Sequence, residues 1–483
     1  MKSKTKRYCS ILLVFLIIIV FVVSFYFKSF YSLSHFEEIL YSIKDGDNNA
    51  DTTFLVIGFK TCLPYCLFLF VLSYLILFKK TKRKMINKIQ SKRKIIIIAS
   101  SFIATFTMFW SISFFKYIYY VVQESDFIKN NYVDSRNVDV KFSNKRNLIV
   151  ISVESLETSL FKKDQGGYWD YEVIPELYDL LSDEDSVVFY NNNLAEQQNM
   201  IQGSSWTTAS IIASTSAIPF KVNINNFTSP TILDNVYSLG DLLKDNGYYN
   251  EVISAANTSY GDLKKYFVDH SIDTVIDNDS LSLYDFKMDL NDEGRWGFND
   301  NYLFKIAKER LTKIASSEEP FFLHLITIDT HFIDGFVGDY STNKYDDQYE
   351  NAYATESKLL GEFISWLKEQ PYYKNTTIVI MGDHLSMQSE FFRKRNVKDR
   401  YVYSCIINPQ TKEANSTNRV YTALDMYPTI VSAIGGYISN EKLGLGVNLF
   451  SNQMTLAEKY GINILDNELK KDSVFYKNTI NSK

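Results

Sequence analysis

Cysteine, proline, glycine and histidine are all scarce in this chain of 483 residues, which contains 4 Cys, 8 Pro, 19 Gly and 5 His. The low Gly and Pro content, beside 46% hydrophobic residues, excludes a collagen-like, low-complexity or disordered protein. Cys9, Cys62 and Cys66 lie in long apolar runs, so Cys405 is alone in the rest of the chain and no disulfide can form there. An apolar core must stabilise that part.

Acidic residues are scarce at the N-terminal end, where residues 1–127 contain 17 Lys and Arg against 7 Asp and Glu. The remaining residues contain 34 basic and 49 acidic side chains. Such an acidic body would repel a polyanion, so we expect no nucleic acid as a partner. A basic, apolar region followed by an acidic one indicates a membrane protein with one soluble body.

Three long apolar runs predict transmembrane helices at about residues 8–27, 61–78 and 95–115, which together form a membrane domain of residues 1–115. No small-residue cleavage site follows the first run, so we expect an uncleaved anchor. The loop KKTKRKMINKIQSKRK, between the second and third runs, has nine basic residues and no acidic one. This loop and the basic N-terminus should be cytoplasmic, which places everything after residue 116 on the extracytoplasmic side of the cell membrane.

The rest of the chain predicts one α/β domain. Residues 116–143 are rich in Tyr and polar residues, which suits a juxtamembrane connector. Within residues 144–452, continuous β-branched and aromatic runs are typical of strands buried on both faces: 147–153, 321–328 and 376–381. Apolar residues three and four positions apart predict amphipathic helices at 301–315 and 352–370. The predicted class is therefore α/β with a mostly parallel sheet, followed by a solvated C-terminal extension, residues 453–483.

Each of the three predicted strands leads directly into residues that can bind metal or move protons. Those residues are Glu154 after the first strand, Asp329, Thr330 and His331 after the second, and Gly382, Asp383 and His384 after the third. Ligands of open α/β sheets bind beyond the carboxyl ends of the strands. The three groups are therefore expected to converge on one cleft.

A fourth stretch, GSSWTTASIIASTSAIP, places small and hydroxylic residues before an apolar run. This pattern predicts that Thr207 lies near the start of a helix, where the backbone N–H groups and the helix dipole favour an anion. A hydroxyl there, next to a divalent metal that lowers its pKa, could attack a phosphoryl centre. The alternative is that Thr207 only caps the helix.

The stretches NLIVISVESLETSLF, GSSWTTASIIASTSAIP, TIDTHFIDGF and IVIMGDHLSM together resemble, in order and spacing, the sulfatase-fold phosphoglycerol transferases of bacterial envelopes. Lipoteichoic acid synthases resemble the chain more distantly. The resemblance covers roughly residues 145–450. It implies an alkaline-phosphatase-like fold, a membrane anchor with the catalytic body outside, and Mn²⁺ or Mg²⁺ as the cofactor.

Position by position, the resemblance implies roles for particular residues. Glu154, Thr207, Asp383 and His384 would be the metal ligands, with Thr207 also the nucleophile, and His331 would lie over the glycerol phosphate. Further candidates for substrate binding are Trp206, Asn257 and Trp296, although a place in the core is the alternative for Trp296.

The implied reaction moves glycerophosphate from phosphatidylglycerol to a hydroxyl of an envelope saccharide or polymer, through a phospho-threonine, and releases diacylglycerol. A phosphoethanolamine transferase, a glycerophosphodiesterase with the same site, or a catalytically silent lipid- or glycan-binding protein are the alternatives. Phosphoethanolamine transferases usually carry several disulfides in the exported domain, which Cys405 alone cannot supply. A true sulfatase is excluded because the one C-x-P stretch, at Cys62, lies in an apolar run and lacks the Arg of that motif.

The chain departs from the family at one point. Where relatives carry a phosphate-binding Arg, the segment AANTSYGDLKKYF has Asn257, Thr258 and Ser259. Lys264, Lys265 and Arg295 are candidates to replace that Arg, and the alternative is that the acceptor differs from that of the relatives. His270, in a polar turn, and His324, within a strand, are expected to have structural roles.

Overall fold

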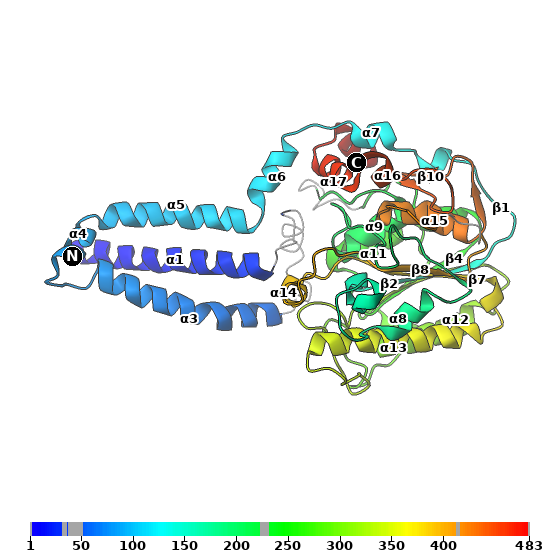
Figure 1. Cartoon of the computed structure of the whole chain (residues 1–483), viewed down its shortest axis with the longest axis horizontal. Coiled ribbons are helices and arrows are strands. Elements are labelled where there is room, and N and C mark those ends of the chain that lie inside the picture. Colours follow the sequence, from blue (N-terminus) through cyan, green and yellow to red (C-terminus); the bar gives the residue numbers. More distant parts are fainter. Residues whose placement is uncertain (1, 31–35, 37–51, 223–230, 412–415, 482–483) are drawn as a thin grey trace. The chain divides into compact units, whose positions relative to one another are not determined.

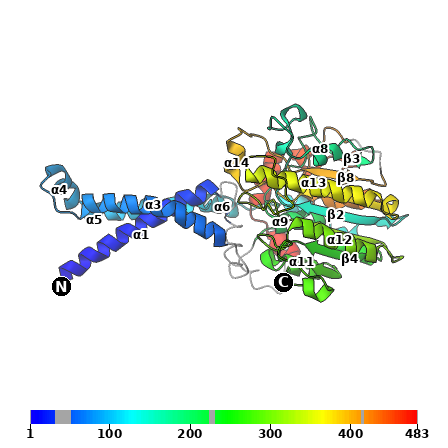
Figure 2. The same cartoon turned by 90° about the horizontal axis from the view of Figure 1, so that it is seen from below.

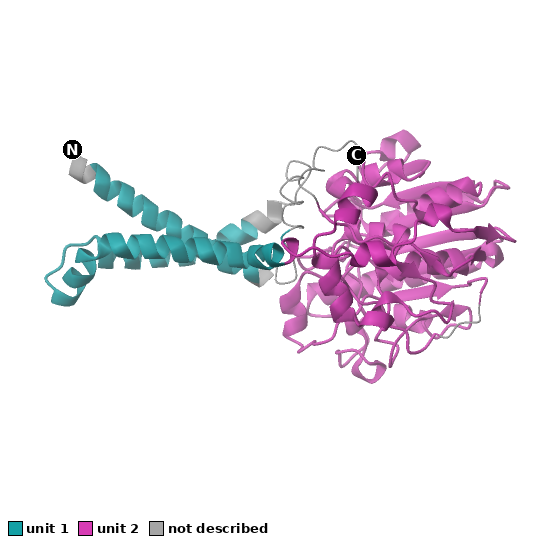
Figure 3. Cartoon of the chain, turned by 90° about the horizontal axis from the view of Figure 1, so that it is seen from above, with its two compact units in different colours: residues 1–43, 50–119 teal, residues 44–49, 120–483 magenta. Residues whose placement is uncertain are grey.

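A computed structural model of the chain describes residues 2–30, 36, 52–222, 231–411 and 416–481. The chain divides into two compact units (Figure 3), the first of residues 1–43 and 50–119 and the second of residues 44–49 and 120–483.

The first unit is built from three long apolar helices, α1 (Lys2–Phe30), α3 (Thr52–Leu77) and α5 (Arg93–Ser111). Each contains a stretch long and apolar enough to cross a membrane: Thr5–Lys28, Val56–Leu77 and Arg93–Ser111. Helix α1 packs against both α3 and α5 through a small cluster that includes Val14, Cys62 and Ile97. Most other side chains of these helices face outward, as expected where lipid and not water is the solvent.

The basic loop after α3 folds back onto the end of that helix. It contains the short helix α4 (Lys84–Ser91), and Gln90 Nε2 donates hydrogen bonds to the carbonyl oxygens of Ile76 and Lys79, at 2.9 and 2.8 Å. The C-terminal carbonyls of a helix have no partner within the helix, so these bonds cap α3. Helix α6 (Phe114–Val121) then leads toward the second unit.

The second unit is organised around a sheet of seven strands in the order β3-β8-β7-β2-β6-β4-β5. The five strands from β7 to β5 are parallel, whereas β8 is antiparallel to β7 and β3 to β8. The strands are β2 (Asn147–Val153), β3 (Ser186–Val187), β4 (Tyr249–Ser254), β5 (Thr274–Ile276), β6 (Phe321–Ile326), β7 (Thr376–Gly382) and β8 (Ser404–Ile407). Every residue of β2, β6 and β7 is buried, as their continuous apolar sequences require.

Helices cover both faces of this sheet (Figure 1). One face packs against α8 (Pro175–Leu180), α12 (Asp300–Ile314) and α13 (Gln348–Lys368), and the other against α10 (Leu239–Asp245) and α15 (Met426–Ala433). Along β2 the faces alternate: Ile149, Ile151 and Val153 join the first core and Leu148 and Val150 the second. The other α-helices in the described part of this unit are α7 (Phe127–Asn131), α9 (Thr207–Ser216), α11 (Leu263–Asp269), α14 (Ser389–Arg393), α16 (Leu456–Tyr460) and α17 (Ile462–Lys470).

Figure 2 gives a second view of the same arrangement, with α13 and α12 lying along the sheet. The predicted α/β class with a mostly parallel sheet is confirmed. The three predicted strands lie within two residues of β2, β6 and β7, and the predicted helix 301–315 lies within one residue of α12, whereas α13 begins at Gln348, four residues before the predicted start. The differences are larger at the membrane runs. Helices α1 and α3 begin earlier than predicted, at Lys2 and Thr52, and the third run is divided, because α5 ends at Ser111 and α6 begins at Phe114.

Both ends of the second unit are tied into its structure. Of the predicted connector, residues 116–143, the part from residue 120 belongs to this unit and contributes β1 (Val140–Phe142), which pairs with β9 (Gly436–Ile438). The segment after residue 453 is helical, but it is packed where the sequence predicts a solvated extension. Leu465 and Leu469 of α17 are buried, and Lys221 Nζ donates to the Leu469 carbonyl at 2.9 Å. A second small hairpin pairs β10 (Lys442–Leu443) with β11 (Gly446–Val447).

Candidate active site

The candidate site lies where three neighbouring parallel strands end. Strand β2 pairs with β7 on one side and β6 on the other, with Val153 opposite Gly382 and Ser152 opposite Ile326. The residues that follow the strands therefore leave the sheet at the same edge. Glu154 leaves β2, Asp383 and His384 leave β7, and the loop to His331 leaves β6.

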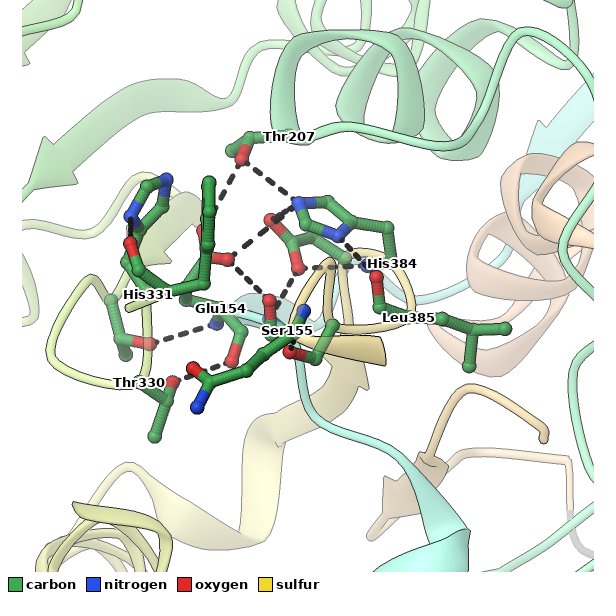
Figure 4. A network of polar contacts seen from close by, with 12 residues as sticks. Glu154, Ser155, Thr207, Thr330, His331, His384 and Leu385 are labelled. Atoms are coloured by element: carbon green, nitrogen blue, oxygen red, sulfur yellow. Dashed lines mark hydrogen bonds and ion pairs between the residues drawn. The ribbon is translucent and has the colours of Figure 1, made fainter. Parts of the chain in front are cut away.

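Glu154, Asp383 and His384 form a buried cluster at this edge (Figure 4). One ligand atom from each lies within 4.8 Å of the others. His384 Nε2 is 3.6 Å from Glu154 Oε1 and 3.4 Å from Asp383 Oδ2. His384 Nδ1 is 3.0 Å from the carbonyl oxygen of Leu385, which can only accept, so Nδ1 carries the proton. The lone pair of Nε2 therefore points into the cluster.

Thr207 is the first residue of α9, and its hydroxyl reaches the same cluster. Thr207 Oγ1 donates to Glu154 Oε2 at 3.3 Å and lies 3.5 Å from His384 Nε2 (Figure 4). Trp206, which precedes the helix, is extended and provides no side-chain cap. The hydroxyl of Thr207 is therefore directed to the cluster and does not act only as a capping group.

Helix α9 can approach the site closely because it is made almost entirely of small residues. Its later hydroxyls are satisfied within the helix, since Thr215 and Ser216 donate to the carbonyls of Ile211 and Ile212 at 2.5 and 2.6 Å. Its start is packed against Gly261, which has φ of +68°, and a Cβ built there would lie 2.4 Å from Thr208 Oγ1. Only glycine fits this contact without strain.

The cluster has the features of a cation site. Asp383 Oδ1 accepts from the backbone N–H groups of Ser155 and His384, both at 2.7 Å. Asp383 Oδ2 is buried and accepts no hydrogen bond from any residue that the structure describes. Burial, and then the neighbouring Glu154, raise the pKa of Asp383 to about 6. A divalent cation would satisfy the second oxygen and offset the repulsion between the carboxylates.

Three hydroxyl residues surround Glu154. The sequence analysis already groups Thr330 with the residues at the strand ends, whereas Ser155 and Thr327 are not singled out there. Ser155 Oγ donates to Glu154 Oε1 at 2.5 Å, Thr330 Oγ1 donates to the Glu154 carbonyl at 2.5 Å, and Thr327 Oγ1 accepts from the Glu154 N–H at 3.0 Å. These bonds hold the backbone and carboxylate of Glu154 in place. Their position could have identified them in the sequence, because each hydroxyl lies next to one of the polar groups at a strand end.

His331 lies beside the cluster without being part of it. Its Nδ1 donates to the Phe332 carbonyl at 2.6 Å, and its ring centre lies 4.7 Å from that of Trp296, edge to face. Burial and the nearby His384 lower the pKa of His331 to about 4. The ring is therefore neutral at pH 7, with Nε2 as a proton acceptor. Trp296 also packs against the main core, which is the alternative that the sequence offers for this residue.

Trp206 and Asn257, the other two predicted substrate-binding residues, have partners outside the cluster. The Trp206 ring packs edge to face on Phe220, at 5.9 Å between ring centres. The Asn257 amide is hydrogen-bonded to Asp279.

His324 and His270 have structural roles. His324 Nε2 lies 2.8 Å from Ser152 Oγ within the sheet, and burial lowers its pKa to about 3. His270 is buried, with Nδ1 2.8 Å from Asp241 Oδ2 and Nε2 3.1 Å from the Ile232 carbonyl. Both are satisfied, as the sequence predicts.

The fold and this site define the class of the protein. A family model described as Sulfatase matches residues 146–437, more than half of the chain. The chain belongs to the sulfatase family, and its second unit has the alkaline-phosphatase and sulfatase fold. With its three long apolar helices, it is a membrane protein that carries a soluble sulfatase-like domain.

Among curated proteins, the chain is similar to phosphoglycerol transferase I of Escherichia coli O6:K15:H31 (strain 536), with 28% identity over 320 residues. That match covers 64% of this chain and 39% of the relative, so the chain spans about two fifths of the length of the curated relatives it matches.

Two solved structures show the same fold at low sequence identity. The lipoteichoic acid synthase LtaP from Listeria monocytogenes is 18% identical with a TM-score of 0.50, over 66% of this chain and 80% of that one. The integral membrane lipooligosaccharide phosphoethanolamine transferase A (EptA) from Neisseria meningitidis is 12% identical with a TM-score of 0.51, over 88% of this chain and 84% of that one.

Proposed function

We propose that the chain is a membrane-anchored phosphoglycerol transferase. It moves glycerophosphate from phosphatidylglycerol to a hydroxyl of an envelope saccharide or polymer and releases diacylglycerol. The observation that carries this proposal is the Thr207 hydroxyl, which lies at the start of α9 and 3.3 Å from Glu154 Oε2. An activated hydroxyl at a helix N-terminus suits attack on a phosphoryl group. The similarity to phosphoglycerol transferase I selects glycerophosphate as the group moved.

In the first step, Thr207 Oγ1 attacks phosphorus. The new bond joins Thr207 to the glycerophosphoryl group, and the bond from phosphorus to the diacylglycerol oxygen breaks. The Thr207 proton passes to Glu154, the acceptor that its hydroxyl already faces, and the diacylglycerol oxygen takes a proton from water.

In the second step, an acceptor hydroxyl attacks the same phosphorus. His331 is neutral at pH 7, so its Nε2 can take the proton of the attacking hydroxyl. The bond to Thr207 breaks, and Thr207 recovers its proton from Glu154. Because His331 is held by Phe332 and Trp296, its ring is fixed before the acceptor arrives.

The side chains that would hold a divalent cation are Glu154, Thr207, Asp383 and His384. When bound, Mn²⁺ or Mg²⁺ would lower the pKa of the Thr207 hydroxyl and offset negative charge on the phosphoryl oxygens. A set of carboxylates and a hydroxyl with one imidazole favours these hard cations over thiolate-seeking metals.

The membrane helices suit a lipid donor, because they keep the domain at the surface where the donor lies. The proposal includes three membrane crossings, with the soluble domain on the extracytoplasmic side. Phosphatidylglycerol and the envelope acceptor would then both be reached without leaving the membrane surface.

The test is diacylglycerol release from labelled phosphatidylglycerol by the full chain, purified in detergent and assayed with Mn²⁺. Thr207→Ala should lower the rate by at least about 1000-fold, because a nucleophile acts as a unit with its activating groups. Thr312→Ala removes an exposed hydroxyl on α12 that bonds only within its own helix, and it should leave the rate unchanged. A chelator should abolish release.

Other outcomes separate the alternatives. Release of diacylglycerol from phosphatidylethanolamine but not phosphatidylglycerol would show a phosphoethanolamine transferase. Release with free glycerophosphate as the only product, even with saccharide acceptors present, would show a phosphodiesterase. No release from either lipid by a protein shown to bind Mn²⁺ would contradict the proposal and indicate a silent lipid- or glycan-binding protein.

A further inference from the structure

Arg295 is held beside His331 by two contacts. Its guanidinium carbon lies 4.6 Å from the centre of the Trp296 ring, and one terminal nitrogen donates to the Ile333 carbonyl at 2.6 Å. Ile333 is two residues after His331, and Trp296 itself contacts the His331 ring. The guanidinium, indole and imidazole therefore form one continuous layer at the end of β6.

Backbone contacts with the end of β4 hold this layer in place. Gly297 lies directly against the Ala255 carbonyl, since a Cβ at Gly297 would be 2.1 Å from that oxygen. Phe298 N–H donates to the same carbonyl at 3.0 Å, and Ala256 and Gly297 form an antiparallel bridge. The segment that carries Arg295 is therefore fastened to the end of β4, and the side chain is presented from a fixed position.

The proposed donor is an anion, so we expect a basic side chain to bind it. A phosphodiester carries a negative charge, and the site already contains the carboxyl groups of Glu154 and Asp383. The segment 257–262, which reaches the start of α9 through Gly261, contains no Lys or Arg. Lys264, which follows it, is paired with Asp277 at 3.6 Å.

An arginine suits this task because its planar guanidinium has several N–H donors. A guanidinium can therefore donate to a protein carbonyl and to phosphate oxygens at the same time. Its charge already acts on the neighbouring ring, since Arg295 is one of the groups that lower the pKa of His331, after burial and His384.

We infer that Arg295 is the anion-binding residue of this site, and that it holds the phosphate of the donor headgroup while stacked on Trp296. This inference deepens the proposed function and rests on it for the identity of the donor. Trp296 is then a positioning residue, which orders Arg295 on one side and His331 on the other.

The test is binding of glycerol 3-phosphate to the full chain in detergent, measured by calorimetry with Mn²⁺ present. Arg295→Gln should weaken binding roughly 10- to 100-fold, as expected for loss of a charged hydrogen-bond donor. Arg295→Lys keeps the charge but not the planar donor set, so its affinity should lie between the two. Glycerol, which is neutral, should show no dependence on residue 295.

The matched control is Lys374→Gln, which removes one positive charge from an exposed position next to the amino end of β7, the opposite edge of the sheet. It should bind glycerol 3-phosphate as wild type does. If Lys374→Gln and Arg295→Gln lost the same affinity for glycerol 3-phosphate, the net charge of the protein would explain the effect, and the inference would be overturned. Wild-type affinity in Arg295→Gln, or no binding by wild type, would also overturn it. Arg295→Lys gives a second test if the Gln variant does not fold.

The inference and the proposed function can fail separately. Binding that depends on Arg295, together with no release of diacylglycerol from phosphatidylglycerol, would retain the anion site and reject the transfer. Release of diacylglycerol by Arg295→Gln with an unchanged KM would retain the transfer and reject this role. Inorganic phosphate should compete with glycerol 3-phosphate if the phosphate group alone is recognised.

Discussion

At the scale of single residues, the Asp383 carboxylate of the candidate site has two oxygens in different environments. One of its oxygens takes two backbone N–H groups, and the other is buried without a hydrogen bond from any described residue. An unsatisfied buried acceptor costs about 1–3 kcal/mol. The nearby carboxylate of Glu154 adds repulsion.

We therefore expect Asp383→Asn to have opposite effects with and without metal. In the metal-free protein, the amide keeps the bonded oxygen and removes one charge, so the free energy of unfolding should rise by about 1–3 kcal/mol. With Mn²⁺ at 100 times its Kd, wild type should gain about 2.7 kcal/mol and the variant almost nothing. Thermal unfolding in chelator and in Mn²⁺ measures both effects.

The control for this substitution is Asp179→Asn, which changes an exposed aspartate on α8. Its unfolding should match wild type in both conditions. If Asp383→Asn were destabilised in chelator and still stabilised by Mn²⁺, Asp383 would be a structural residue and not a metal ligand.

At the scale of elements, β6 and α12 are joined by two buried aspartates. The Asp300 carboxylate accepts from the N–H groups of Ile328 and Asp329, and Asp329 Oδ2 accepts from the Asp300 N–H at 2.9 Å. Helix α13 adds Glu356, which is buried and whose two oxygens accept no hydrogen bond from the described residues. Burial, and then Asp329, raise the pKa of Glu356 to about 8.

This cluster predicts a loss of stability as the pH rises. The pKa of Glu356 is higher in the folded state than the roughly 4.3 of an unfolded chain, so its protonated form stabilises the fold at low pH. That contribution is lost between about pH 4 and pH 8 as the unfolded state ionises. Glu356→Gln, which cannot ionise, should unfold at a higher temperature than wild type by more at pH 8 than at pH 5.

Each kcal/mol that the substitution adds to the free energy of unfolding should raise Tm by roughly 2–4 °C. The measurement is made in detergent, with a chelator present at both pH values. Glu362→Gln changes an exposed residue of the same helix and should follow the pH dependence of wild type. An equal Tm difference between Glu356→Gln and wild type at the two pH values would show that Glu356 is ionised in the folded protein.

The same elements show what could be predicted from the sequence. The runs at β2, β6 and β7 are identifiable because strands buried on both faces must be continuously apolar. Their shared edge follows from parallel pairing, which is why the residues after them could be grouped from the sequence alone. The metal and catalytic roles assigned to those residues stay predictions until variants are measured.

Other features depend on long-range contacts that no local pattern encodes. Edge strands such as β3, with two residues, are set by pairing with β8 and have no periodicity of their own. From the sequence alone, Arg295 is only one of several basic residues that could bind an anion. Its place beside His331 depends on the contact of Gly297 with Ala255. Glu356 lies in an amphipathic helix, where a carboxylate is ordinarily expected on the solvent side.

At the scale of the whole molecule, charge and hydropathy predict which side of the membrane each part occupies. The basic loop after α3 should be cytoplasmic because basic loops are retained on that side. With three crossings, residues 120–483 would then lie outside, where the proposed lipid donor and envelope acceptor would both be available. If the soluble domain were cytoplasmic, an envelope polymer could not be the acceptor.

Single cysteines can test this orientation. The four native cysteines are free, so they can be replaced by Ser without breaking a disulfide. Lys80→Cys then marks the basic loop and Lys374→Cys the soluble domain, both at exposed positions. On bacterial spheroplasts, a membrane-impermeant maleimide should label Lys374→Cys at once and Lys80→Cys only after permeabilisation. The reverse pattern would place the soluble domain in the cytoplasm, and labelling of both before permeabilisation would rule out three crossings, because the two positions would then lie on the same side.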